Sequence, residues 1–138
     1  MARTIAMMRR RRRRMGLVRI DIEVARPGRG ARWRAAPGVL VDSGAEITWL
    51  DADLLRGAGV TVFKRDQPFI MANGQQITRD VGIAIVRSGE FKTVDEVVFA
   101  HPGDLQLLGA RTLEGFNAIV DVRRKRLVTA GPMPAAVA

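Results

Sequence analysis

A single carboxylate interrupts an apolar stretch of this 138-residue chain. Residues 39–50 read VLVDSGAEITWL, so that Asp42 is followed at once by the small residues Ser43 and Gly44. The apolar runs on both sides predict two strands that enter and leave a tight turn. A turn of this kind holds a carboxylate rigidly beside a hydrophobic core, and such an environment suits the group for acid–base chemistry.

The chemistry that one such carboxylate can support depends on a second one. Peptide hydrolysis without a metal or a covalent nucleophile needs a base to activate water and an acid to protonate the leaving group, and two adjacent carboxylates that share one proton supply both. The sequence Asp-Ser-Gly occurs once in the chain, so a pair of such carboxylates requires two chains related by a two-fold axis. We therefore expect Asp42 to meet its counterpart across a homodimer.

Other catalytic chemistries have little support in the composition. The chain has no cysteine and one histidine, which argues against thiolate metal sites, a His-rich zinc site and a Ser–His triad. We interpret Asp51 and Asp53 as residues of a helix start and His101 as an exposed loop residue. No metal and no cofactor are expected.

The elements that must position Asp42 are mostly strands. Polar and apolar residues alternate over residues 17–24, which predicts a strand with one wet face. Pro27, Gly28 and Gly30 predict a turn, and residues 31–36 a second strand. Pro37-Gly38 then leads into the strand that delivers Asp42, and a short helix is expected after Leu50, beginning at Asp51 and ended by Gly57 and Gly59.

The dipeptide Asn73-Gly74 predicts a projecting hairpin. It stands between two β-prone runs at residues 69–72 and 75–78. A two-residue turn of this composition takes positive φ at both central residues.

The last part of the chain alternates between strands and one short helix. Residues 81–86 and 94–99 predict two strands around a turn at Ser88-Gly89. After Leu107-Leu108-Gly109, a short helix is expected over residues 111–114, with Gly115 as its stop, followed by a strand over residues 118–122.

Three of these landmarks, in this order, resemble the retropepsin-like aspartic proteases. That family carries an apolar-apolar-Asp-Ser/Thr-Gly-Ala motif, present here from Leu40 to Ala45. It places a flap hairpin between this catalytic loop and the last strands, and it follows an apolar-apolar-Gly element, here Leu107 to Gly109, with a helix and a closing strand. The resemblance covers residues 17–128.

The resemblance implies an all-β fold, a closed β-barrel with a flap hairpin and one or two short helices, active as a homodimer on a peptide or protein substrate. It assigns catalysis to Asp42 and a hydroxyl that locks the two loops across the dimer axis to Ser43. Gly44 offers its amide to the carboxylates, and Ala45 keeps the loop small. The flap tip is Met71, Ala72, Asn73 and Gly74, and the loop beside the active site is Leu107, Leu108 and Gly109.

Charge and composition predict how the chain is divided. The net charge is +9, of which Arg3 and the run from Arg9 to Arg14 contribute seven in a segment without acidic residues, and subtracting seven from nine leaves +2 for the remainder. We expect a disordered tail at residues 1–14, one domain at residues 15–130 and a flexible end at residues 131–138. Pro132 and Pro134 argue against a strong terminal strand of the kind that viral relatives interleave at their dimer interface, so a different interface is expected.

No apolar run is long enough to span a bilayer, and Arg19 and Asp21 interrupt any secretory signal, so we expect a soluble, cytoplasmic protein without membrane contact. Two alternatives to a protease stay open. One is a module of the same fold that binds extended peptides by strand addition without effective catalysis. The other is a nucleic-acid-associated factor that makes its contact through Arg9 to Arg14.

Overall fold

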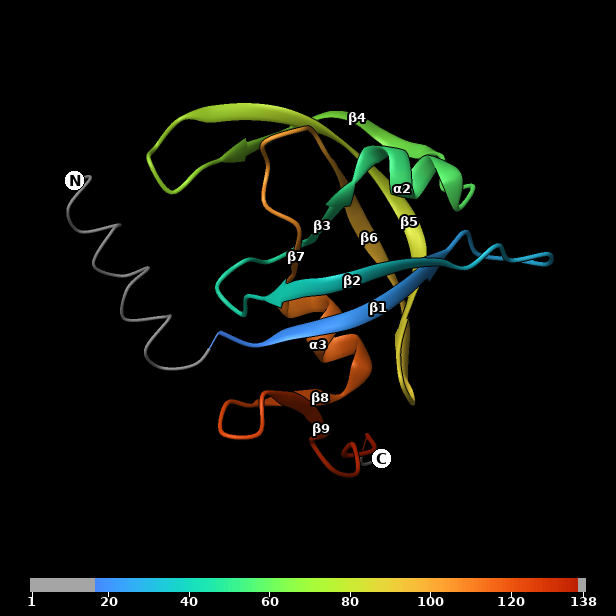
Figure 1. The fold of residues 1–138 in the computed structure, drawn as a ribbon, viewed down its shortest axis with the longest axis vertical. Coiled ribbons are helices and arrows are strands. Elements are labelled where there is room, and N and C mark those ends of the chain that lie inside the picture. The colour runs from blue at the N-terminus through green and yellow to red at the C-terminus, as the bar shows by residue number, and fades with distance from the viewer. Residues whose placement is uncertain (1–16, 137–138) are drawn as a thin grey trace.

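Strands dominate the computed structural model, which describes residues 17–136 (Figure 1). The Arg-rich segment, with Arg9 to Arg14, lies outside the described residues. In the part described, nine strands and two short helices follow one another as β1 Arg19–Ala25, β2 Arg34–Val41, β3 Thr48–Asp51, α2 Ala52–Gly57, β4 Val62–Ile70, β5 Gln76–Ser88, β6 Phe91–Ala100, β7 Leu107–Leu108, α3 Ala110–Phe116, β8 Ala118–Asp121 and β9 Arg126–Thr129. The expectation of a mostly β protein with one or two short helices is confirmed.

Seven strands form one sheet in the order β1-β2-β7-β3-β6-β5-β4. Strand β1 also pairs antiparallel with β5, where Glu23 to Ala25 face Arg87 to Ile85. The two-residue strand β7 is inserted between β2 and β3, parallel to the first and antiparallel to the second. Strands β8 and β9 form a separate two-stranded sheet. The insertion of β7 places residues from late in the chain beside the strand that leads to Asp42.

The core lies among these strands and the two helices. Its fully buried members are mainly β-branched and leucine side chains, which suit strands that are covered on one face. Helix α2 begins at Asp51, whose carboxylate accepts a hydrogen bond from the Leu54 amide as predicted. The largest apolar side chains that are fully buried are Ile22, Val24, Leu50, Leu55, Val81, Val86, Val97, Val98 and Leu108, and Phe99 and Phe116 are buried almost as completely.

Two sequence-based boundaries are wrong. Strand β2 is continuous through Pro37 and Gly38, where we expected a break between two strands. One residue of β1, Asp21, faces these two residues in a bulge, and its carboxylate accepts a hydrogen bond from the Gly38 amide at 2.9 Å. The bulge accommodates the proline, which has no amide hydrogen to donate to the ladder.

Helix α3 does not stop at Gly115. It continues to Phe116, and Asn117 ends it in the left-handed conformation with φ of 52°. Gly115 serves packing instead, because a Cβ at this position would collide with the Thr93 side chain on β6. No regular element follows Thr129 up to residue 136, and within the described chain no helix has the length and apolar character to cross a membrane.

Candidate functional site

Asp42 is the first residue after β2 and begins the loop of residues 42–47. The Gly44 amide donates to Oδ1 of Asp42 at 3.0 Å, the contact expected of this glycine, and the Ala45 amide donates to the Asp42 carbonyl at 3.1 Å. Asp42 is half-buried, whereas Ser43 and Gly44 are exposed. The loop therefore holds its carboxylate in a fixed turn at the protein surface.

Residues 107–111, which form β7 and the start of α3, pack closely against this loop, and we call this segment the clasp. Leu40 and Val41 pair with Leu107 and Leu108, and the Asp42 amide donates to the Leu108 carbonyl at 2.9 Å. At the start of α3, the amides of residues 110 and 111 donate to the carbonyls of residues 45 and 46 at 2.7 and 3.1 Å. Two of the predicted landmarks, residues 40–45 and 107–109, are thus in direct contact.

Gly109 allows this close approach. A Cβ built on it would lie 2.7 Å from the Ile47 carbonyl group and 2.9 Å from the Glu46 oxygen, distances that real Cβ atoms essentially never show. Any side chain here would push the clasp away from the loop. The glycine of the apolar-apolar-Gly element is therefore required by backbone contact rather than by a positive φ, since its φ as helix N-cap is −90°.

A buried hydrogen-bond chain continues from this glycine. The Gly109 amide donates to Thr48 Oγ1 at 3.0 Å, Thr48 Oγ1 lies 2.6 Å from Thr112 Oγ1, and Thr112 Oγ1 donates to Oδ2 of Asp95 at 3.1 Å. A hydroxyl has one hydrogen to give, so Thr112 must accept from Thr48. The chain runs in one direction, from the clasp to β6.

Sequence reasoning missed this network. Thr48 and Thr112 are the two fully buried polar side chains of the described residues. Thr48 stands between the apolar residues Ile47 and Trp49, whereas Thr112 follows Arg111. A hydroxyl at a core position of a strand is a signal that an internal partner exists, although it does not identify that partner.

The β4–β5 hairpin forms the predicted projection, with a different turn. The Gly74 amide donates to the Met71 carbonyl and the Met71 amide to the Gln75 carbonyl, both at 2.8 Å. Gly74 takes φ of +83°, but Asn73 does not take a positive φ, so the expectation for both residues is wrong. The turn is a three-residue loop, in which the Asn73 side chain accepts from the Gln75 amide at 2.9 Å.

The exposed tip and the Asp42 loop lie on the same side of the molecule (Figure 1). A salt bridge connects the base of the hairpin with the loop before β7, since Arg79 donates to both oxygens of Asp104 at 2.7 and 2.9 Å. Arg79 holds the pKa of Asp104 below its usual range, and the His101 amide adds a further hydrogen bond. His101 itself is exposed, as expected.

Apolar contacts add to this link. The rings of Trp49 on β3 and Phe69 on β4 meet edge-on with centroids 5.1 Å apart. Close to them is a cavity of about 250 Å³ that joins the loop to the hairpin. It is lined by Glu46 and Ile47 of the loop, by Lys64 and Gln67 to Phe69 of β4, and by Val81, Glu96 and Arg111.

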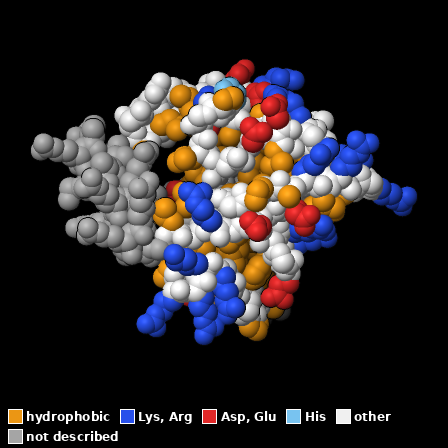
Figure 2. All heavy atoms as spheres, in the orientation of Figure 1, with side chains coloured by type: hydrophobic (Ala, Val, Ile, Leu, Met, Phe, Trp, Pro, Cys, Tyr) orange, Lys and Arg blue, Asp and Glu red, His pale blue; other side chains and the backbone are white. Residues whose placement is uncertain are grey.

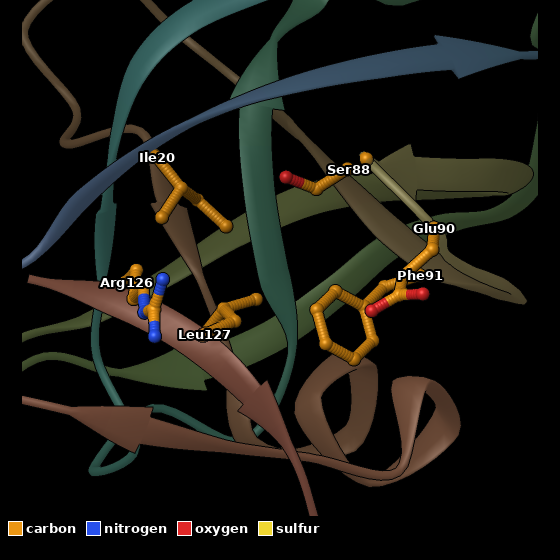
Figure 3. Close-up of a pocket in the computed structure, with 7 residues that line it drawn as sticks. Ile20, Ser88, Glu90, Phe91, Arg126 and Leu127 are labelled. Carbon is orange, nitrogen blue, oxygen red and sulfur yellow. The ribbon is translucent and has the colours of Figure 1, made fainter.

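A larger pocket contains none of the predicted site residues. Its volume is about 400 Å³, and it lies between β1, the β5–β6 turn and β9 (Figure 3). Ile20, Phe91 and Leu127 give it an apolar lining, with Glu90 and Arg126 on opposite sides. Among the described residues no three of the metal-binding types gather in one place.

The comparisons with known proteins give no family for this chain. No protein-family model matches the sequence, and a search of curated proteins finds no similar one.

Proposed function

We propose that the protein is an aspartic endopeptidase of the retropepsin type, in which two copies of the chain each contribute Asp42. The observation that carries the proposal is the geometry of the 42–47 loop. Oδ1 of Asp42 accepts a hydrogen bond from the Gly44 amide, and β7 and Gly109 pack directly against the strand and loop that hold Asp42. Such a loop presents one carboxylate rigidly at an exposed surface, where a second copy can face it.

The mechanism follows from the pairing of two identical carboxyl groups. Repulsion between them favours the state in which one is protonated and the other ionised. The ionised carboxylate takes a proton from a water molecule, whose oxygen bonds to the carbonyl carbon of the peptide. The C–N bond then breaks as the protonated carboxyl group delivers its proton to the leaving nitrogen. The hairpin with Gly74 at its tip closes over the substrate and excludes bulk water.

The strand pairings support the finer fold assignment. Because β1 pairs with both β2 and β5, the strand order can return on itself, as in a closed barrel, with β4 left as an added strand. The exposed Ser43 and Gly44 leave the loop surface available for the second copy. The hydrogen bonds that hold this loop lie within one copy of the chain, so the loop keeps its shape without a contact from the second copy.

The test is the digestion of a peptide library at mildly acidic pH by wild type and by Asp42→Asn, with sedimentation of both. We expect a dimer in both cases and a loss of about 10²–10⁴-fold in cleavage rate. Asp53→Asn is the matched control, because Asp53 is exposed on α2 and forms an ion pair with its helix neighbour Arg56, away from the 42–47 loop. Cleavage by Asp42→Asn at the rate of the control, or by a strictly monomeric chain, contradicts the proposal.

A binding function without catalysis is the second candidate, and the position of β4 favours it. This strand stands at the end of the sheet order and, among the described strands, pairs with β5 alone, so its outer edge offers backbone groups that can accept an added strand. Fluorescence anisotropy with labelled library peptides, together with an assay of their cleavage, distinguishes the binding module from the protease. Binding by wild type without turnover across pH 3–7 supports this candidate, and turnover refutes it.

A further inference from the structure

The hairpin loop between β1 and β2 concentrates positive charge. Residues 26–34 read RPGRGARWR and contain four arginines, and no acidic residue occurs between positions 24 and 41. In the part of the chain that the structure describes, none of these four guanidinium groups forms an ion pair. The ion pairs of the described residues are made by cations elsewhere, namely Arg56, Lys64, Arg65, Arg79, Arg87, Arg111 and Arg124.

Two of the four arginines hold the loop in shape. Arg26 donates to the Arg29 carbonyl at 2.8 Å, and its amide donates to the Ala58 carbonyl at 3.2 Å. Arg34 donates to the Gly57 carbonyl at 3.2 Å. The side chains of Arg29 and Arg32 make no such contact with described residues. They are exposed, and their charges are therefore available to a ligand.

A cation–π pair of Arg87 and Trp33 stands at the base of this loop. The guanidinium carbon of Arg87 lies 3.5 Å from the centroid of the Trp33 ring, and Arg87 is fixed by Glu23 at 3.0 Å. Trp33 is half-buried. Arginine planes and indole rings are the groups on which nucleic-acid bases stack.

The hairpin projects from the end of the molecule opposite to the Asp42 loop (Figure 1). Figure 2 shows Lys and Arg side chains gathered at this end. Because the loop precedes β2 and the Asp42 loop follows it, the two lie at opposite ends of one strand. The basic surface is therefore separate from the candidate active site.

We infer that residues 26–34 form a binding surface for single-stranded nucleic acid. Uncompensated guanidinium groups on a glycine-rich loop fit a flexible phosphodiester backbone, and the Trp33–Arg87 pair offers a platform for a base. An anionic lipid surface offers charge alone, and the loop lacks a large aliphatic side chain that would insert into a membrane. The inference does not rest on the proposed protease activity.

The experiment measures anisotropy of a labelled 16-nucleotide single strand against salt for the full chain and for Arg29→Ala/Arg32→Ala. Losing two phosphate contacts lowers the slope of log affinity against log salt by about 1.4, at about 0.7 per contact. Over the decade from 1 M to 0.1 M salt this corresponds to a loss of about 25-fold at 0.1 M. Both proteins keep residues 1–16, so any contribution from that segment cancels.

The matched control is Arg65→Ala/Arg124→Ala, which removes the same charge from two exposed arginines beside Asp80 and Asp121. We expect this control to bind with nearly wild-type slope, and Arg29→Lys/Arg32→Lys to retain most of the slope because phosphate contacts need charge. An equal loss in the control overturns the inference. So does an unchanged slope in the alanine variant.

Two further probes test which kind of ligand the surface binds. An abasic strand of the same length keeps the phosphates but lacks bases, and we expect it to bind at least fivefold more weakly. Equal affinity for the abasic strand overturns the assignment to nucleic acid. Vesicles with 30% phosphatidylserine are the other probe, and the assignment is also overturned if the alanine variant loses only vesicle binding.

Discussion

The hydrogen-bond chain from Gly109 to Asp95 predicts an energetic coupling between Thr48 and Thr112. Thr48→Val removes two bonds, the one accepted from Gly109 and the one donated to Thr112. Thr112→Val removes the bond with Thr48 and the one donated to Asp95. The bond between the two hydroxyls is lost in either variant, so a double variant loses three bonds where the two single variants together lose four.

The magnitudes follow from burial. Thr48 and Thr112 are both fully buried, and Gly109 is buried as well, so its amide has no access to water in Thr48→Val. An unsatisfied buried group costs about 1–3 kcal/mol, and we expect about 2–3 kcal/mol for this variant. Thr112→Val removes a hydrogen bond from the Asp95 carboxylate, which is half-buried and partly reached by water. We therefore expect a loss of about 1–2 kcal/mol in the free energy of unfolding for this variant. The double variant should cost about 1 kcal/mol less than the sum, the value of one hydrogen bond.

Urea unfolding at fixed protein concentration measures these three differences. Thr78→Val is the control, because Thr78 is exposed on β5 and its substitution should stay within about 0.5 kcal/mol of wild type. Additive costs in the double variant would refute the direct bond between the hydroxyls. Single variants as stable as the control would refute the whole chain of bonds and with it the account of how Gly109 is positioned.

Three further predictions concern the clasp, the salt bridge and the hairpin tip. Gly109→Ala should cost at least about 1–3 kcal/mol in urea unfolding because its Cβ meets loop backbone, whereas Gly57→Ala, whose Cβ meets nothing closer than 3.7 Å, should be tolerated. Asp104 has its pKa lowered by Arg79, so its contribution to stability is complete above the unfolded-state value near 3.8 and is lost as pH falls through the folded-state pKa. Urea midpoints of Asp104→Asn should therefore fall less than those of wild type between pH 5 and pH 2, and a parallel fall would contradict this. Gly74→Ala, at φ of +83°, should destabilise the turn by about 1 kcal/mol and raise hydrogen exchange at the hairpin tip, and unchanged exchange would speak against it.

Local signals identified most of the elements because their causes are local. Asp51 caps α2 by accepting a hydrogen bond from the Leu54 amide, three residues further along the chain. The alternation of polar and apolar residues in β1, β5 and β6 indicates which side of each strand is covered. The contact of residues 40–45 with residues 107–109 was predicted only through the family resemblance. The dimer and its catalysis stay predictions.

Two features that the sequence alone does not predict have a different cause, which is contact between distant segments. The sequence predicts Gly115 as a helix stop, yet a side chain at this position would collide with Thr93 on β6. Strand β9 is missed for a local reason. Residues 126–129 carry no clear period, and the strand forms because it pairs with the neighbouring β8 across a turn in which Lys125 takes φ of 53°. Thr48 and Thr112 are 64 residues apart, and no local pattern encodes that distance.

Strand β2 joins the two surfaces for which we propose functions. Its eight residues span roughly 26 Å at about 3.3 Å per residue, with Arg32 just before one end and Asp42 just after the other. Effects of substitutions at such separation usually add, because the sites share no partner. Asp42→Asn should therefore leave the salt dependence of oligonucleotide binding unchanged, and Arg29→Ala/Arg32→Ala should leave cleavage of short peptides unchanged. Since a strand within a sheet is rigid, a ligand held at one end neither blocks nor reshapes the other, and each proposal can fail without the other.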